Sequence, residues 1–415
     1  MGTGAIEYNP PEWLTQSFLE EILRDHFNDV NINVSNLRTI SLVKTNGYAS
    51  ILHKCQFKYT KDNENFDKFS LIIKEHPKGL SGILAFKHKL FKREILIYKD
   101  ILPRIQDLLR TINETTKIAP ICYYTTETPE PFLILEDMTY NQYEMFERNR
   151  LFNLQQVIPV IEKIAKFHAC SVIIAEQNPG IMDFFEEGPI SDNPDRQNFL
   201  GFFPASIKEL AEEVAKWQGF EEICEKLYRL EKTIISKGKD LFKSNKDEFR
   251  VLNLGDLWIS NVMIKVDEQL LPEDVVLLDY QLAYYGSPAI DLNYFLYGSL
   301  NENVRKVHYK YIIKEYHQIL NKTLSELNYT GYIPTLKDLH IKIIKKSLMA
   351  VIAASCLTPL IFNGSDENPD ENDNRGTGML DTDSIPKKLN LDENPKYKAF
   401  IQRTLKEFDL SGFLD

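Results

Sequence analysis

The chain has 415 residues, 43% hydrophobic and 26% charged, which is ordinary for a soluble globular protein with one large or two moderate domains. Its formal net charge of −11 argues against a nucleic-acid partner, because no surplus of Lys and Arg exists to neutralise phosphates, although a local basic cluster would suffice for a nucleotide. The five cysteines lack paired spacing, and we find no secretory signal or bilayer-length apolar stretch, so we expect a cytoplasmic protein without a membrane partner.

The first third of the chain has the pattern of a small antiparallel sheet. Helical periodicity covers residues 12–28 and 83–101, and we expect the second helix to end before Pro103. Apolar, β-branched runs predict strands at residues 37–44, 48–59, 66–74, 119–124 and 132–135. Residues 30–136 are therefore predicted to form an antiparallel sheet with one inserted helix.

The remainder is mainly helical and carries a small strand insert. Helical periodicity predicts helices at residues 154–172, 205–217, 223–236, 303–327 and 336–356. Strand signals occur at residues 251–252, 262–266 and 275–279. Residues 363–383 are acidic and rich in Gly, Asn and Asp, which favours a solvated surface loop over a lid above a substrate site. The chain as a whole is predicted to be an α+β protein.

Three polar residues in the strand insert have a spacing that suits phosphoryl transfer. Asp256 and Asn261 form an Asp-x-x-x-x-Asn pattern, and Asp279 ends an apolar strand. Carboxylate and amide oxygens are the ligands that Mg²⁺ prefers. We therefore assign Asp256 to accepting or orienting the proton of a substrate hydroxyl, and Asn261 and Asp279 to holding Mg²⁺.

A lysine and a glutamate in the first third suit the binding of nucleotide phosphates. Lys74 closes the third predicted strand, and Glu94 lies in the following helix. A strand lysine paired with a helix glutamate holds the α- and β-phosphates of ATP in kinases. Read alone, Lys74 would be a solvated edge charge, and its combination with the three polar residues of the insert favours the kinase interpretation.

Two further segments are assigned to ATP. The turn before the second strand would cover the phosphates with small side chains and backbone N–H groups, as an alternative to a plain β-turn, and its residues are Gly47, Tyr48, Ala49 and Ser50. Glu136 and Met138 join the sheet to the helical part, where free backbone groups could pair with an adenine edge. The alternative for this segment is a simple linker.

Three residues near these motifs have competing interpretations. Asp291 opens the segment 290–297 and is expected to cap a helix or brace a loop. His168 lies on the apolar face of its helix, where a buried histidine with satisfied hydrogen bonds is expected. Trp258 lies inside the catalytic loop and either lines an acceptor pocket or packs in the core.

At these residues the chain resembles the ecdysteroid-kinase-like family, within the choline- and aminoglycoside-kinase-like small-molecule kinases. The matching stretches are residues 47–50, 73–74, 91–95, 119–120, 135–138, 165–171, 255–258 with Asn261, 278–281, 286–288 and 291–292. The resemblance implies a two-lobed, protein-kinase-like fold, with a nucleotide-binding lobe at residues 1–136 and a helical lobe at residues 137–415. It also implies ATP- and Mg²⁺-dependent phosphorylation of a hydroxyl on a small molecule, such as a steroid alcohol.

Two departures from the family pattern leave alternatives open. Leu254 stands where the family usually has a histidine that braces the catalytic loop, and Thr45 stands where the covering loop tends to have glycine. The first departure motivates a pseudokinase that binds nucleotide or a steroid-like ligand without turnover. A protein kinase is less favoured, because no Ala-Pro-Glu segment follows Asp279. The sequence leaves the acceptor and the oligomeric state open.

Overall fold

The largest sheet is antiparallel, five-stranded and ordered β1-β2-β3-β5-β4. In this computed structural model, the described residues are 11–42, 50–61, 64–76, 89–128, 130–146, 151–193, 200–243, 245, 248–362, 391–392 and 394–415. The strands of the sheet are β1 (Asn33–Ser41), β2 (Ile51–Lys61), β3 (Glu64–Glu75), β4 (Cys122–Thr126) and β5 (Phe132–Glu136). The predicted antiparallel sheet is thus present, with strand ends shifted by a few residues.

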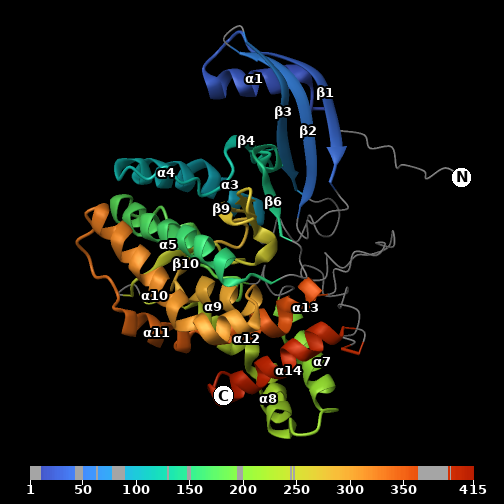
Figure 1. Ribbon diagram of the computed structural model, residues 1–415, viewed down its shortest axis with the longest axis vertical. Coiled ribbons are helices and arrows are strands. Elements are labelled where there is room, and N and C mark those ends of the chain that lie inside the picture. The colour runs from blue at the N-terminus through green and yellow to red at the C-terminus, as the bar shows by residue number, and fades with distance from the viewer. Residues whose placement is uncertain are drawn as a thin grey trace, which may run out of the picture.

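Helix α1 (Gln16–Phe27) packs on this sheet. Its first turn is capped by the Thr15 hydroxyl, which accepts a hydrogen bond from the Phe18 backbone N–H at 3.2 Å. Apolar side chains of α1, including Leu19 and Leu23, share a small core with the sheet. Figure 1 places α1 and strands β1 to β3 at one end of the molecule and helices α7 (Phe202–Val214), α8 (Glu221–Phe242) and α14 (Pro395–Leu410) at the other.

The inserted helix runs past Pro103, so the predicted end before this proline is wrong. The chain forms α3 (Leu90–Leu96), a π-helical turn η1 (Ile97–Ile101) and then α4 (Leu102–Thr111). Pro103 falls in the first turn of α4, where the missing backbone N–H of proline is tolerated. The predicted start of this helix, residues 83–88, lies outside the described residues.

Most other described elements are helical. The helices are α5 (Leu154–Gln177), α7 (Phe202–Val214), α8 (Glu221–Phe242), α9 (Ala289–Gly298), α10 (Glu302–Glu326), α11 (Leu336–Lys345), α12 (Leu348–Ile352), η6 (Ala353–Leu357), α13 (Thr358–Phe362) and α14 (Pro395–Leu410), and the 3-10 turns are η2 (Met138–Asn141), η3 (Asp183–Phe185) and η5 (Ile259–Asn261). One continuous apolar core extends from α3 to α14. No helix in the described ranges is long and apolar enough to cross a bilayer.

The single helix predicted over residues 336–356 is divided into α11, α12 and η6. The Asn293 side-chain amide donates to the Ile343 and Lys346 carbonyls, at 2.9 and 3.0 Å, and so satisfies two carbonyls at the end of α11. This contact comes from a different helix, α9, and no local pattern announces it. Helix α14 was not predicted, and the acidic segment 363–383 lies outside the described residues.

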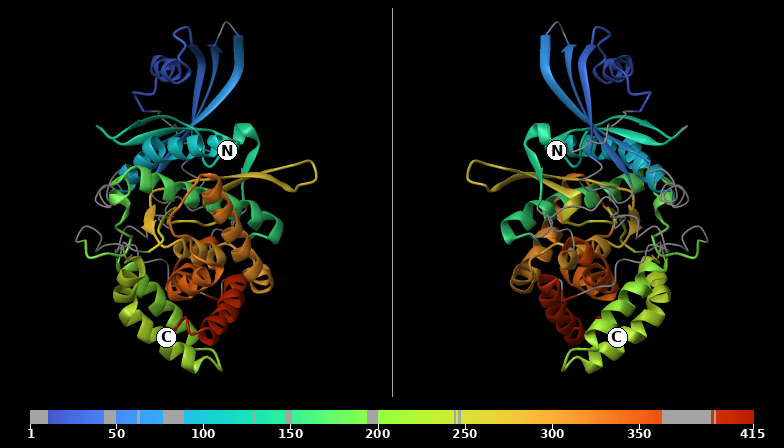
Figure 2. Two further views of the ribbon diagram at one scale, coloured as in Figure 1. Left: turned by 90° about the vertical axis from the view of Figure 1, so that its left-hand side faces the viewer. Right: turned by 90° about the vertical axis from the view of Figure 1, so that its right-hand side faces the viewer.

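The predicted strand insert is present as β7 (Val251–Asn253), β8 (Val262–Val266) and β9 (Pro272–Leu277), and two further short strands, β6 (Tyr143–Met145) and β10 (Tyr284–Gly286), pair with it and were not predicted. Strands β6, β8 and β9 form one antiparallel sheet, and β7 pairs with β10. Strands β8 and β9 form a hairpin that projects between the five-stranded sheet and the lower helices (Figure 2). The predicted strand 275–279 therefore ends two residues earlier, at Leu277, and Asp279 follows it in a loop.

Candidate active site

Lys74 and Glu94 form a buried ion pair between the sheet and α3. The Lys74 ammonium lies 2.9 Å from Glu94 Oε1 and 2.7 Å from Oε2, and both residues are almost fully enclosed. Burial alone would lower the pKa of Lys74, but the carboxylates of Asp279 and Glu94 outweigh it and hold this pKa above its ordinary value. The lysine is therefore a fixed cation near the end of β3, the central strand of the sheet.

Asp279 brings the strand insert to this pair. Its Oδ1 lies 3.2 Å from the Lys74 ammonium, and its backbone adopts the left-handed region with φ of 58°. A non-glycine residue in this region is uncommon and is found more often at functional sites. The Leu278 N–H donates to the Asn261 carbonyl at 2.8 Å, so the hairpin register places Asn261 beside the segment that carries Asp279.

Asp256 is held by two side-chain donors. The Asn261 amide donates to Asp256 Oδ2 at 2.9 Å and to the Asp256 carbonyl at 2.8 Å, and the Tyr294 hydroxyl donates to Oδ1 at 2.6 Å. Burial, followed by the negative charge of Asp279, raises the pKa of Asp256 to about 6. The carboxylate therefore has a fixed orientation and an elevated proton affinity, as suits a group that accepts a proton.

The loop before Asp256 is braced through its backbone. The Leu254 N–H donates to Asp291 Oδ2 at 2.7 Å, and the Gly255 N–H donates to Oδ1 at 2.9 Å. His168 is fully buried, and its Nε2 donates to the same Asp291 carboxylate at 3.2 Å, while Nδ1 pairs with the Tyr316 hydroxyl at 2.8 Å. The expected loop-bracing role of Asp291 and the expected buried, satisfied histidine are thus both found.

Gly255 is required by this loop geometry. Its φ is 78°, and a Cβ placed there would lie 2.0 Å from the Leu282 carbonyl oxygen. A larger residue would therefore meet backbone that cannot yield easily, and it would also adopt a strained conformation. The sequence Gly-Asp in this loop thus has a direct steric reason.

The segment between the sheet and the helices is fixed by Asp137. Its carboxylate accepts hydrogen bonds from the Ser70 hydroxyl at 2.6 Å and the Thr139 N–H at 3.0 Å, and it pairs with Lys54 at 2.7 Å. Burial raises the pKa of Asp137, but the hydrogen bonds from Lys54, Ser70 and Thr139 outweigh it and place the pKa below its ordinary value. The carboxylate therefore ties β2 and β3 to the linking segment.

An apolar cluster lies beside this segment. Met138, Met263 and Val276 are buried in it, and Leu278, which directly precedes Asp279, packs against them. Met138 was assigned to ATP from the sequence, whereas Met263 and Leu278 were not. Both could have been suggested by their proximity in the sequence, because Met263 follows Asn261 by two residues and Leu278 directly precedes Asp279.

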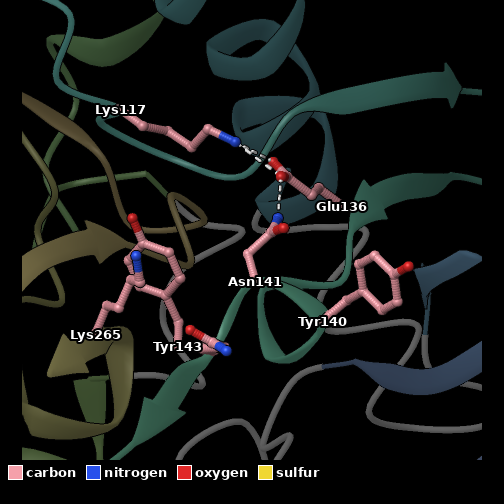
Figure 3. A pocket seen from close by; sticks show the side chains of 7 residues that line it. Lys117, Glu136, Tyr140, Asn141, Tyr143 and Lys265 are labelled. Atoms are coloured by element: carbon pink, nitrogen blue, oxygen red, sulfur yellow. Dashed lines mark hydrogen bonds and ion pairs between the residues drawn. The ribbon is translucent and has the colours of Figure 1, made fainter. Parts of the chain in front are cut away.

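The Glu136 side chain is engaged outside this cluster. It accepts hydrogen bonds from the Lys117 ammonium at 2.7 Å and the Asn141 amide at 2.6 Å (Figure 3), and from the Ile121 N–H at 3.0 Å. Glu136, Lys117 and Asn141 line a hollow of about 550 Å³. The other lysine of the hollow, Lys265, pairs with Glu273 at 3.1 Å. The Glu136 N–H donates to the Ile121 carbonyl at 2.8 Å, so a nucleotide contact from Glu136 would have to come from its backbone carbonyl.

The oxygen atoms around Asp279 suit a magnesium ion. Within the described residues, no group of three or more His, Cys, Asp and Glu has the arrangement of a metal site. The predicted magnesium ligands are instead the Asp279 carboxylate and the Asn261 amide. Both N–H donors of this amide are directed at Asp256, so only the Asn261 side-chain oxygen is available to a cation. Hard oxygen donors of this kind are those that Mg²⁺ takes from proteins.

Two buried polar atoms adjoin the set. Ser260 Oγ and Gln281 Nε2 have no hydrogen-bond partner within the part of the chain that the structure describes. Buried polar atoms are nearly always paired in folded proteins. Their presence on either side of the catalytic loop and Asp279 fits a site that is completed by a polar ligand.

The remaining predicted residues are only partly placed. Gly47, Tyr48 and Ala49 lie outside the described residues, and Ser50 directly precedes β2. Trp258 is largely buried and belongs to the main core, which favours the packing interpretation. Tyr294 was missed, although its position three residues after Asp291 places both side chains on one helix face.

The fold and the site define a class. A small antiparallel sheet that carries a lysine–glutamate pair, next to many helices and a loop with Asp256 and Asn261, is compatible with a kinase-like fold. The model of the ecdysteroid kinase-like family matches residues 44–329, which is more than half of the chain, so the protein belongs to this family. Membership indicates a kinase-like phosphotransferase. A search of curated proteins gives no match.

Proposed function

We propose that the protein is an ATP- and Mg²⁺-dependent phosphotransferase that phosphorylates a hydroxyl of a small molecule. In this proposal, residues 1–136 form a nucleotide-binding lobe, and residues 137–415 form a helical lobe with the acceptor site. The observation that carries it is the Lys74 ammonium, which pairs with both Glu94 and Asp279 at a point where Asp256 and Asn261 also meet. This combination of groups suits phosphoryl transfer, where catalysis is mostly positioning and charge neutralisation.

Each residue has a distinct role in the proposed reaction. Lys74, held by Glu94, binds the α- and β-phosphates, and Asp279 and Asn261 supply oxygen ligands for the metal. When bound, Mg²⁺ neutralises the charge of the β- and γ-phosphate oxygens. Asp256 orients the acceptor hydroxyl and accepts its proton, for which its raised pKa is favourable.

The nucleobase is proposed to lie against the apolar cluster of Met138, Met263 and Leu278. The cluster joins the linking segment to the residue that precedes Asp279, so a base held there would direct its phosphates towards Lys74. Backbone groups of Glu136 and Met138 would then read the adenine edge. The turn residues 47–50 would cover the phosphates.

The acceptor is proposed to be an alcohol, with steroid alcohols as the first candidates because the family is named for ecdysteroid kinase activity. We also propose a cytoplasmic location, from the cysteine spacing in the sequence. A pseudokinase is the second candidate, motivated by Leu254. It is less favoured because Asp291 braces the loop through backbone N–H groups, which every residue except proline provides at position 254.

The test is phosphate transfer from Mg-ATP to a panel of alcohols that includes steroids, choline and aminoglycosides. We expect transfer to at least one of them and no transfer by Asp256→Ala, with ATP bound by both proteins. ATP binding without transfer or hydrolysis would support the pseudokinase, and transfer to choline or an aminoglycoside alone would reject the steroid class. Transfer that persists in Asp256→Ala would reject the assigned base.

A further inference from the structure

Tyr294 is a buried residue at the site that the proposed roles leave unassigned. Only 4% of it is exposed, and its ring lies beside Gly298 on the next turn of α9, where a Cβ would stand 3.9 Å from two ring atoms. A Cβ at that distance would make only ordinary van der Waals contact, so the position of the ring does not depend on the glycine. The Tyr294 hydroxyl reaches Asp256 Oδ1 at 2.6 Å. This is a short hydrogen bond of the kind that an ionised acceptor forms.

Tyr294 and Asn261 together fix the plane of the Asp256 carboxylate. One donor is directed at Oδ1 and the other at Oδ2, so rotation of the carboxylate would break both hydrogen bonds. Each carboxylate oxygen has a second lone pair, which remains for a substrate hydroxyl. The two donors therefore select one orientation without using up the capacity of Asp256 to accept a proton.

We propose that Tyr294 is a positioning residue that holds Asp256 in the orientation in which it accepts the proton of the acceptor hydroxyl. This role rests on the proposed function. One face of helix α9 then contacts the catalytic loop through two residues. Asp291 fixes the loop backbone, and Tyr294, three residues later, fixes the side chain of Asp256.

A tyrosine suits this role because it donates without carrying charge. Burial, followed by the negative charge of Asp256, holds the pKa of Tyr294 well above its ordinary value. The hydroxyl therefore remains a donor at any pH of interest. A lysine in its place would neutralise Asp256 and weaken it as a proton acceptor, whereas the phenol leaves the carboxylate charge in place.

The experiment compares Tyr294→Phe with a matched control on the same helix, Tyr297→Phe. Tyr297 is also buried and its hydroxyl donates to a carboxylate oxygen, Glu407 Oε1 at 3.2 Å, but it does not contact the catalytic loop in the described structure. For each full-length protein, kcat and KM for Mg-ATP are measured as transfer to the best alcohol of the panel, or as phosphate release to water. We expect kcat of Tyr294→Phe to fall about 10- to 100-fold with KM within about twofold, as for a small misplacement of a catalytic group. The control should retain both values.

A double-mutant cycle tests whether the effect passes through Asp256. If it does, Tyr294→Phe should cause no further loss in an Asp256→Asn background, because the base that it positions is already absent. An active wild type with unchanged kcat in Tyr294→Phe would overturn the role of Tyr294 alone. Additive losses in the cycle, or loss of nucleotide binding together with turnover, would overturn it too. A wild type that transfers phosphate to no acceptor, water included, would instead overturn the proposed function, and this role with it.

Discussion

Asp256→Asn should leave only a small residual turnover and yet stabilise the protein without ligands. The pKa of Asp256 is raised to about 6 from the ordinary 3.8, chiefly by burial. Each pH unit of this difference corresponds to about 1.4 kcal/mol, so the ionised carboxylate destabilises the fold by up to roughly 3 kcal/mol at neutral pH. Because Asp256 is only half-buried, water reduces the destabilisation by its charge, and we expect Asp256→Asn to raise the free energy of unfolding by about 1–2 kcal/mol.

The asparagine can keep the local geometry. Its oxygen can accept from the Asn261 amide, and its NH₂ group can donate to the Tyr294 hydroxyl oxygen, since a hydroxyl both donates and accepts. The variant therefore removes the charge while the two contacts of Asp256 remain possible. The gain in stability should then reflect the charge alone.

The pH dependence gives the decisive measurement. The folded pKa of this acid lies above the unfolded value, so its ionisation destabilises the fold above pH 6, and the effect disappears as the pH falls towards 3.8. Urea unfolding of both proteins at pH 7.5 and pH 4.5 should show the variant more stable at the higher pH, with the difference reduced to about a third at the lower pH. Equal stability at both pH values, or a less stable variant at pH 7.5, would refute the argument.

Three other variants should have effects of known sign. Lys74→Met should raise KM for ATP or abolish turnover. Unlike Asp256→Asn, it should also lower the free energy of unfolding in urea by roughly 2 kcal/mol, because buried Glu94 is left without its cation. An unchanged urea midpoint of unfolding would contradict this. Asp291→Asn leaves a backbone N–H of the catalytic loop without a good acceptor, so kcat should fall about tenfold. ATP binding, measured by thermal shift, should be retained. Full activity of the variant would reject the bracing role of Asp291. The pKa of Asp137 is lowered, so its ionised carboxylate stabilises the fold above pH 3.8, and this stabilisation declines as the pH falls below 3.8. Asp137→Asn should lower the free energy of unfolding in urea by about 2 kcal/mol at pH 7, and a difference that does not shrink as the pH is lowered from 4 would count against this.

The sequence predicted what local patterns encode. The ends of β3 and the periodicity of the following helix placed Lys74 near Glu94, and the structure brings them together. The spacing of Asp256 and Asn261 within one loop likewise allowed their pairing to be foreseen. These contacts depend on short-range geometry or on a family pattern that includes both partners.

Long-range contacts set the features that the sequence did not predict. The end of α11 depends on the Asn293 amide of α9, and the orientation of Asp256 depends on Tyr294 of the same helix. In both cases a side chain from a fully buried helix determines the structure of a distant segment. Helix α9 is apolar around most of its circumference, so its hydrophobic periodicity does not distinguish a buried face from an exposed one. The two polar contacts of Asn293 and Tyr294 could therefore not be predicted from it.

The buried helix α9 also explains why Leu254 is compatible with an ordered catalytic loop. A histidine at this position would brace the loop with its side chain, whereas here Leu254 is fully buried in the apolar core and the polar brace comes from Asp291. Because Asp291 binds backbone N–H groups, its hold does not depend on the side chain at position 254. His168 then keeps the Asp291 carboxylate in place from the other side. Order in the loop and the identity of residue 254 are therefore separable, and the substitution alone does not argue for a protein without turnover.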